Sequence, residues 1–162
     1  METPIKNNGL KTSDWLLFIM CIVVTAGITL IYTEVHKHNM IAQSRFSYNL
    51  NKDFDNNIVD TAIAADIENR KHLLTINGGR WDDRQLSNYL GFYELLQDYI
   101  DAGSLNVRDV FDNYSYDILA AYNHPEIKKY IDTLRAETKD NAYYEKFENL
   151  AKNFAAANAI KK

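Results

Sequence analysis

Cysteine, glycine and proline are all scarce in this 162-residue chain, and each scarcity narrows the range of possible folds. The single cysteine, Cys21, lies inside an apolar run, so no intrachain disulfide can form. Six glycines and two prolines provide few turns, whereas eleven tyrosines and seven phenylalanines provide much apolar surface to bury. This balance favours long helices over many short strands.

A surplus of positive charge is also lacking. The chain has 18 basic and 22 acidic side chains, which gives a formal net charge of −4 at pH 7. Proteins that bind nucleic acid need cationic side chains to neutralise the phosphates, so we expect no nucleic-acid partner. The length suits one folded domain and a short additional segment.

One long hydrophobic run near the N-terminus is the most informative feature of the sequence. It reads WLLFIMCIVVTAGITLIY from Trp15 to Tyr32, and no charged residue occurs from Trp15 through Thr33. As an α-helix this run would be about 27 Å long, close to the hydrocarbon thickness of a bilayer, about 30 Å. Trp15 and Tyr32 stand at its two ends, where aromatic side chains favour the headgroups. We predict a tail over residues 1–14 and a single transmembrane helix over residues 15–33, anchored in membrane lipid by these two residues.

Two other interpretations of the run have less support. A cleaved signal peptide would use Lys6 and Lys11 as its positive segment and the small residues 25–27 near its cleavage site. The apolar run continues beyond those small residues, however, and has no small-residue cleavage site at its end. A buried core helix of a soluble protein would need a larger protein around it, because this run is apolar on every face.

The flanking charges barely distinguish the two orientations of such a helix. Lys6 and Lys11 precede the run, while Lys37 and Arg45 follow it at a similar distance. The positive-inside rule therefore gives nearly a tie. The family resemblance described below favours the cytoplasm for the C-terminal domain.

Helical structure is predicted to continue beyond the run, because no glycine or proline occurs from residue 28 to residue 77. We predict a juxtamembrane helical stalk over residues 34–57, with a break near the asparagines at 51–57. A helical domain follows over residues 58–158, with a short tail over residues 159–162. Its first helix should end at Asn77, before two glycines. Its apolar side comprises Val59, Ile63, Ile67 and Leu74, and its solvated side comprises Asp60, Glu68, Arg70 and Lys71.

Start and stop signals divide the rest of the domain into four helices. The first begins at Asp82 with a capping box and ends at Gly103. The second begins after Asn106, a preferred N-cap residue, and the third begins at Pro125. The fourth begins near Asn141. In chain order, the predicted core residues are Leu86, Tyr89, Leu90, Tyr93, Leu96 and Ile100; Val107, Val110, Phe111, Tyr114, Ile118 and Tyr122; Ile127, Tyr130, Ile131 and Leu134; and Tyr144, Phe147, Leu150, Ala151 and Phe154.

The predicted fold class is therefore all-α: a single N-terminal transmembrane helix, a juxtamembrane helix, and a small bundle of four to five helices. The stretch RQLSNYLGFYELLQDYIDAGSLNVRDVF and the later YYEKFENLAKNF resemble a family of bacterial membrane-anchored proteins known only as a domain of unknown function. The resemblance covers about residues 80–154, and Tyr89, Leu90, Glu94 and Gly103 carry it. It implies the same architecture and no catalytic residues.

Two places in the domain are candidate interaction or pocket residues. Arg80 and Trp81 stand at a helix entry, where an exposed tryptophan would form a binding spot and a buried one would form a hydrophobic staple. Tyr93 and Glu94 lie among many aromatic residues that would line a ligand pocket or, alternatively, fill the core. Alternatively, Glu94 would be a buried structural carboxylate that pairs with Arg108 or Arg84.

Motifs for metal binding and catalysis are missing from the sequence. The acidic stretch at 53–57 resembles the start of a calcium loop, but Ile58 and Ala64 replace the glycine and glutamate that such a loop requires. His36 and His38 are two residues apart, so they point to different faces of a helix and cannot share a metal there. We therefore predict no metal site, no cofactor and no catalytic residue.

Two classes of function remain open. The first is a non-enzymatic, membrane-tethered helical interaction or scaffold protein that docks a protein partner or self-associates. The second is a sensor of a small ligand or lipid headgroup, or a weak enzyme, with a pocket between the aromatic-rich helices. Whether the protein is an enzyme is not decided by the sequence, but the lack of motifs favours the first class.

Overall fold

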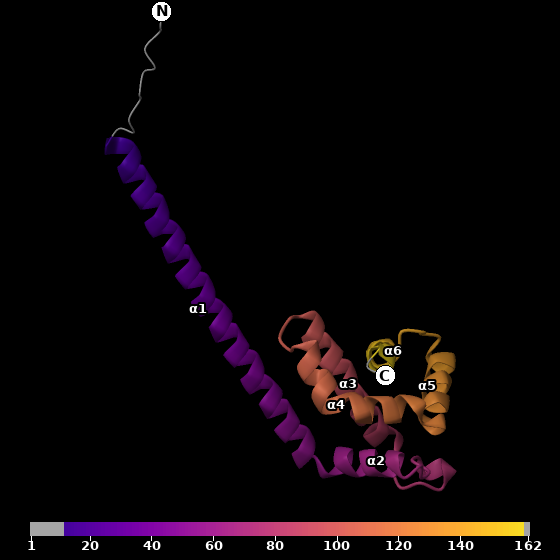
Figure 1. Cartoon of the computed structure of the whole chain (residues 1–162). Helices are drawn as coiled ribbons and strands as arrows, with labels where there is room; N and C mark the ends of the chain where they lie inside the picture. Colours follow the sequence, from indigo (N-terminus) through magenta and orange to yellow (C-terminus); the bar gives the residue numbers. More distant parts are fainter. Residues whose placement is uncertain (1–11, 161–162) are drawn as a thin grey trace, which may run out of the picture. The chain divides into compact units, whose positions relative to one another are not determined.

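The computed structural model describes residues 12–160, and within that range the protein is all-α (Figure 1). The predicted tails at residues 1–11 and 161–162 lie outside the described range. The chain forms two units, up to Ala42 and from Gln43 onwards, and each is described by itself. The elements are α1 (Thr12–Asn56), α2 (Ile58–Glu68), the 3-10 helix η1 (Thr75–Asn77), α3 (Asp83–Asp101), α4 (Val107–Asn123), α5 (Pro125–Thr138) and α6 (Glu145–Ile160).

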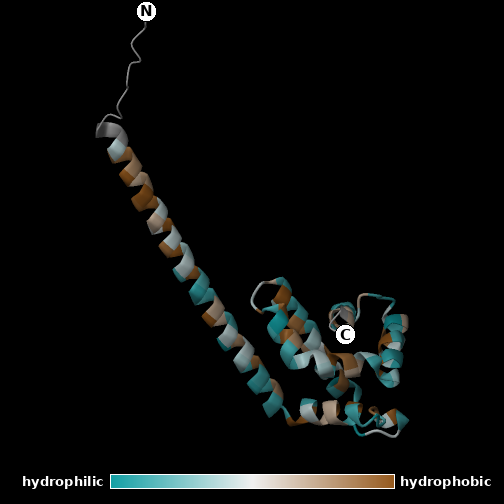
Figure 2. Ribbon diagram, in the orientation of Figure 1, coloured by the Kyte–Doolittle hydropathy of each residue, from teal (hydrophilic) through white to brown (hydrophobic). Residues whose placement is uncertain are grey.

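The first unit contains the N-terminal part of α1, which is strongly hydrophobic (Figure 2). Between Trp15 and Tyr32, its large apolar side chains are each 52–70% exposed. The hydroxyls of Thr25 and Thr29 donate to the carbonyl oxygens of Cys21 and Thr25, at 2.7 and 2.8 Å. The polar groups of these threonines are therefore satisfied within the helix, and the surface of this segment is apolar all round.

The predicted break near residues 51–57 is confirmed, because α1 ends at Asn56 and Asn57 is the N-cap of α2. The Asn57 side-chain oxygen accepts from the backbone N–H groups of Val59 and Asp60, at 3.1 and 3.4 Å. Its amide nitrogen donates to the Asp60 carboxylate at 2.6 Å. Asp60 is buried, so its assignment to a solvated face was wrong. The hydrogen bond from Asn57 compensates part of the cost of that burial.

α2 ends at Glu68, so the prediction of one helix up to Asn77 was wrong. Arg70 adopts a left-handed conformation, with φ of 52°. The N–H of Arg70 bonds to the Ile67 carbonyl and that of Lys71 to the Asp66 carbonyl, which is the hydrogen-bond pattern of a Schellman motif. An ion pair between Lys71 and Asp66, at 3.1 Å, replaces the hydrophobic contact that often accompanies this motif.

The predicted signals around α3 and α4 are confirmed. Asp82 caps α3 in a reciprocal capping box with Gln85. Gly103 follows the C-cap of α3 with φ of 69°, a conformation that glycine adopts without strain. Asn106 caps α4 by accepting from the Arg108 N–H at 2.8 Å. Val107 was expected in the core, but it is 52% exposed because it occupies the first position of the helix.

Residues 141–144 form turns before α6, which begins at Glu145 rather than near Asn141. Pro125 is the first residue of α5, as predicted. Within the second unit, α6 packs against α3 and α4, α2 packs against the same two helices, and α5 packs against α4. The end of α1 also belongs to this unit, because Phe54 is buried in its core and stacks on Phe92 with ring centroids 4.9 Å apart. The second unit thus includes the C-terminal part of α1 from Gln43 onwards.

Candidate functional site

The apolar part of α1 is the first candidate site. Within the described residues, α1 is the one helix that is long and apolar enough to cross a membrane. Trp15 and Tyr32, the predicted anchor residues, are 57% and 70% exposed. They are about 26 Å apart along the helix axis at 1.5 Å per residue, which matches the hydrocarbon thickness of a bilayer.

Arg80 and Trp81, predicted as an interaction spot, both bind one buried carboxylate. Asp66, which is 2% exposed, accepts from the Arg80 Nε–H at 2.7 Å and from the Trp81 indole N–H at 3.0 Å. The Lys71 ammonium is a third donor, and the Arg80 guanidinium lies 4.5 Å above the centre of the Trp81 ring. Trp81 is buried rather than exposed. Its contribution is therefore to hold the loop between α2 and α3, residues 69–82.

The ionisation of Asp66 reflects this environment. Burial raises the pKa of its carboxyl, but the hydrogen bonds from Lys71, Arg80 and Trp81 outweigh burial and hold the pKa below its usual value. The side chain is therefore a carboxylate at neutral pH. Its charge is compensated by Lys71, which lies in the loop after α2, and by Arg80 and Trp81, which precede α3.

Glu126 holds the same loop, residues 69–82, from the start of α5. Its two carboxylate oxygens accept from the backbone N–H groups of Leu73 and Leu74, both at 2.9 Å, and one of them also accepts from the Asn77 side-chain amide at 2.5 Å. Burial raises the pKa of the Glu126 carboxyl, but these bonds outweigh it and the net shift is downward. Gly79 lets the loop close, because an added Cβ would lie 2.2 Å from the Leu73 carbonyl oxygen.

Tyr93, a predicted pocket residue, is fully buried. Its hydroxyl donates to the Tyr89 hydroxyl at 2.8 Å, and its ring stacks on Phe147 with centroids 5.8 Å apart. Burial raises the pKa of Tyr93 well above its ordinary value, so the phenol is neutral at every physiological pH. The side chain fills the core, which was the alternative interpretation of the aromatic residues.

Glu94, the neighbouring predicted residue, faces the start of α6. Its carboxylate interacts with the backbone N–H groups of Lys146 and Phe147, which lie in the first turn of that helix. A carboxylate at this position is favoured by the unpaired N–H groups and the helix dipole. Burial nevertheless raises the pKa of Glu94. This helix-capping role replaces the pairing with Arg84 or Arg108 considered from the sequence.

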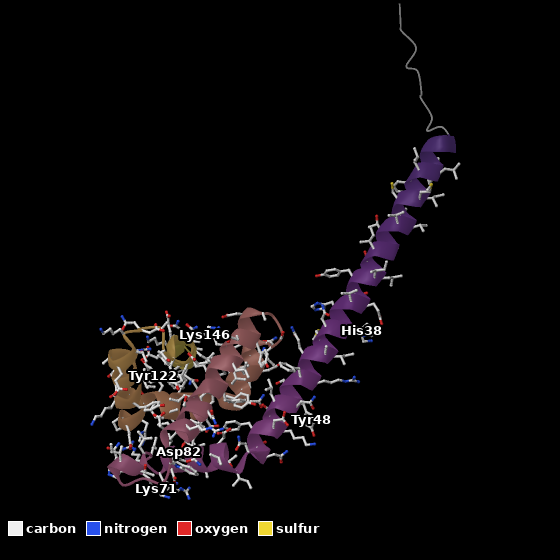
Figure 3. The ribbon with its side chains drawn as sticks, turned by 180° about the vertical axis from the view of Figure 1, so that it is seen from behind. His38, Tyr48, Lys71, Asp82, Tyr122 and Lys146 are labelled. Atoms are coloured by element: carbon white, nitrogen blue, oxygen red, sulfur yellow. The ribbon has the colours of Figure 1, made fainter. Side chains whose placement is uncertain are left out.

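A groove of about 1110 Å³ lies between the end of α2, the second half of α4 and the start of α5. None of the four predicted residues (Arg80, Trp81, Tyr93 and Glu94) lines it. Ile67, Leu119, Ala120 and Pro125 form its apolar surface. Its charged and polar lining comprises Glu68, Arg70, Lys71, His72, Asn77, Ser115, Tyr116, Asn123, His124, Glu126, Lys129 and Asn158, and Lys71 is labelled in Figure 3.

His124 is the unusual member of this groove. Its side chain is 6% exposed and lines the cavity, yet its Nδ1 atom has no hydrogen-bond partner. Burial lowers the pKa of the imidazole, and the Glu126 carboxylate and a hydrogen bond with the Lys71 backbone partly oppose that shift. His124 also precedes α5 as its N-cap residue without forming a side-chain cap. A buried nitrogen without a hydrogen-bond partner destabilises a folded protein, so this nitrogen requires a structural or functional explanation.

A comparison with protein families gives a match over residues 20–154 to a domain of unknown function, DUF4760. The chain belongs to the DUF4760 family. The match confirms the resemblance to a domain of unknown function and extends it towards the N-terminus, so that it includes most of the apolar run of α1. No curated protein and no solved structure matches the chain.

The sequence did not single out Asp66 and Glu126, which hold the loop of this DUF4760 domain, or His124, which lines the groove. Asp66 lies beside the apolar stripe of Ile63 and Ile67, and that position was the only signal for its burial. Glu126 has the position of an ordinary first-turn acid, and its partners lie about fifty residues earlier in the chain. Among residues 15–159, no cluster of three His, Cys, Asp or Glu side chains suits a metal ion.

Proposed function

We propose that this DUF4760 protein is a single-pass membrane protein whose C-terminal helical domain is a non-enzymatic interaction module. The observation that carries the proposal is the exposure of the apolar segment of α1, where the large apolar side chains between Trp15 and Tyr32 are each more than half exposed. Transfer of such side chains out of water is favourable by about 25 cal/mol per Å² of apolar surface. A bilayer is the environment that covers a helix apolar on every face.

The interior of the domain supports an interaction role rather than an enzymatic one. The half-buried or buried carboxylates of Asp66, Glu94 and Glu126 each face donors from backbone or side chains, and those contacts position helices and a loop. In the core, the Tyr93 hydroxyl donates a hydrogen bond to the Tyr89 hydroxyl. These groups are already used to hold the fold, so none of them is poised as a general acid or base.

In this proposal the domain lies on the cytoplasmic side, with a protein partner or a second copy as the molecule it binds. The charges that flank the apolar run are nearly balanced, so the support for this side comes from the resemblance to bacterial membrane-anchored proteins. A topology reporter fused after Lys162 tests the orientation. Reporter activity specific to the periplasm would contradict it.

Membrane insertion is tested with a matched pair of variants on α1. Val23→Arg/Val24→Arg places two charges in the middle of the apolar segment, whereas Val35→Arg/Met40→Arg places them on exposed residues of the same helix beyond that segment. Each arginine at the centre of a membrane helix costs about 2.5–3.5 kcal/mol. The full-length first variant should leave the membrane fraction during alkaline carbonate washing, and the second should stay.

Equal extraction of both variants would contradict the proposal, as would extraction of the unmodified protein. Mass spectrometry of the unmodified, membrane-bound protein distinguishes a retained anchor from a cleaved signal peptide. The retained anchor predicts a mass that includes residues 15–33. A mature chain that begins after this segment would establish the signal-peptide interpretation.

The alternative function, sensing of a small ligand, is favoured by one observation: the groove that contains His124. This groove lies away from the aromatic-rich core, where the sequence suggested a pocket. The polar and apolar side chains that line the groove determine which ligands it can bind.

A further inference from the structure

The end of α1 is held against α3 and α4 by aromatic side chains alone. Phe54 stacks on Phe92 with ring centroids 4.9 Å apart, and it meets the Tyr114 ring edge-on at 5.7 Å. Within the described residues, no hydrogen bond or ion pair joins residues 51–56 to α3 or α4. The Tyr114 hydroxyl and the Asn51 side-chain oxygen are both buried without a hydrogen-bond partner. Charges beside this contact are therefore not offset by polar bonds across it.

Three carboxylates from three different helices lie close together beside this contact. Asp117 lies on α4, and its half-buried carboxyl has a pKa raised by burial, by Glu68 at the end of α2 and by Asp55 in the last turn of α1. The nearest bases in the sequence, Lys52 and Arg70, form no ion pair in the described part of the chain. No base lowers the pKa of Asp117. The cluster therefore carries like charges without a counter-ion.

The other titratable groups around Asp117 are phenols and further acids. The negative charge of Asp117 acts on tyrosine hydroxyls of α3 and α4, namely those of Tyr89, Tyr93, Tyr114 and Tyr116. These phenols have raised pKa values and are neutral at physiological pH. Asp60 of α2 acts on the Tyr89 hydroxyl, and Asp53 of α1 acts on that of Tyr114. From α5 and α6, no charged group acts on Asp117. A proton bound here thus removes repulsion without breaking an ion pair.

The direction of the pH effect follows from Asp117. Because the pKa of its carboxyl is raised from 3.8, the folded protein binds this proton more tightly than the unfolded chain does. Folding stability from this group is therefore highest at low pH and falls as the pH rises from 3.8 through the folded pKa. Above that pH, the charges of Asp117 and Asp55 oppose the approach of α1 to α4, whereas the packing of Phe54 favours it at every pH.

We propose that Asp55, Glu68 and Asp117 form a pH-sensitive device that loosens the end of α1 from α4 at neutral pH and tightens it when a proton binds. α1 is the helix that carries the apolar segment, so the device sets how firmly the end of that helix is held. This inference goes beyond the proposed interaction role and does not depend on membrane insertion. The full-length chain can therefore be tested in detergent, which covers the apolar segment in either case.

The test is hydrogen–deuterium exchange, followed by mass spectrometry of peptides that cover residues 51–56. Rates are corrected for the intrinsic effect of pH on exchange. Asp117→Asn keeps the shape of the side chain and removes its charge, so it represents the protonated group. At about pH 7.5, these amides should exchange roughly two- to fivefold more slowly in Asp117→Asn than in the wild type. At about pH 4.5 the difference should narrow, because the wild type then binds the proton itself.

Two further variants separate the effect of charge from other effects of substitution. Asp132→Asn is the matched control, because Asp132 is exposed on α5 and does not act on Asp117. It should stay within about 1.5-fold of the wild-type rate at both pH values. Glu68→Gln keeps an acceptor for the Tyr116 hydroxyl but removes a charge that raises the pKa of Asp117. The pH at which protection of residues 51–56 changes should therefore be lower in this variant.

Several results would overturn the proposal. These are equal or faster exchange of Asp117→Asn at about pH 7.5, the same slowing in Asp132→Asn, or a difference from the wild type that is equal at both pH values. If Asp117→Asn does not fold, as judged by circular dichroism, Glu68→Gln decides, and an unchanged midpoint in that variant would reject the device. Failure here leaves the carbonate-extraction result unchanged, so the two proposals are separately testable.

Discussion

Asp66 should be among the most important polar residues for the stability of the domain, because it is buried and binds Trp81, a member of the hydrophobic core. Replacing it with alanine leaves the Trp81 indole N–H buried without an acceptor, which costs about 1–3 kcal/mol. The bonds to Lys71 and Arg80 add less, about 0.5 kcal/mol each, because both cations are more than half exposed. We therefore expect Asp66→Ala to lower the free energy of unfolding by about 2–4 kcal/mol.

The assay is urea unfolding of the full-length chain in detergent, followed by tryptophan fluorescence and circular dichroism. A double-mutant cycle isolates the bond to Trp81. Trp81→Phe removes the donor, so Asp66→Ala should cost at least about 1 kcal/mol less in the Trp81→Phe background than in the wild type. A change below about 0.5 kcal/mol for Asp66→Ala, or strictly additive effects in the cycle, would refute the assignment of Asp66 as the organiser of the loop.

Three further predictions concern the same region. Arg70→Gly should raise the free energy of unfolding by about 1 kcal/mol in urea titrations, because glycine adopts φ of 52° without strain. In contrast, Thr133→Gly in the middle of α5 should lower it by about 1 kcal/mol. Gly79→Ala should lower the thermal midpoint markedly in calorimetry, since its Cβ would meet the Leu73 carbonyl oxygen, and an unchanged midpoint would contradict the tight turn. The carboxyl of Glu126 has a pKa lowered from 4.5, so its contribution to stability is present above pH 4.5 and is lost as the pH falls through the lower folded value. Glu126→Gln should flatten the acid limb of a plot of stability against pH, and an unchanged limb would argue against this role.

The elements with local signals were predictable from the sequence. Asp82 with Gln85, Asn106, Pro125 and Gly103 each act within one turn of the backbone they cap, so a few neighbouring residues were sufficient to predict the starts of α3, α4 and α5 and the end of α3. Hydrophobic periodicity likewise identified most of the core, because each of those helices buries one face.

Features that depend on partners far along the chain were not predictable in this way. α2 ends early although no glycine or proline follows it for nine residues, because Arg70 adopts the left-handed conformation and Asp66 binds Lys71, Arg80 and Trp81 together. Glu94 approaches the start of α6 from α3, across about fifty residues of sequence. The groove likewise forms between α2, α4 and α5, which are separate in the sequence. No local sequence motif therefore connects the residues that line it.

The central claim, that α1 is a retained membrane helix, is tested most directly by the chain's only cysteine. Cys21 lies within the apolar segment and is exposed on the surface of α1. In isolated membranes it should resist a water-soluble maleimide and react once detergent and denaturant are added. A Tyr48→Cys variant in a Cys21→Ser background is the control, because Tyr48 is 67% exposed and lies beyond the apolar segment (Figure 3). That cysteine should react without detergent. Rapid labelling of Cys21 in intact membranes, or a mature chain that lacks it, would contradict the account.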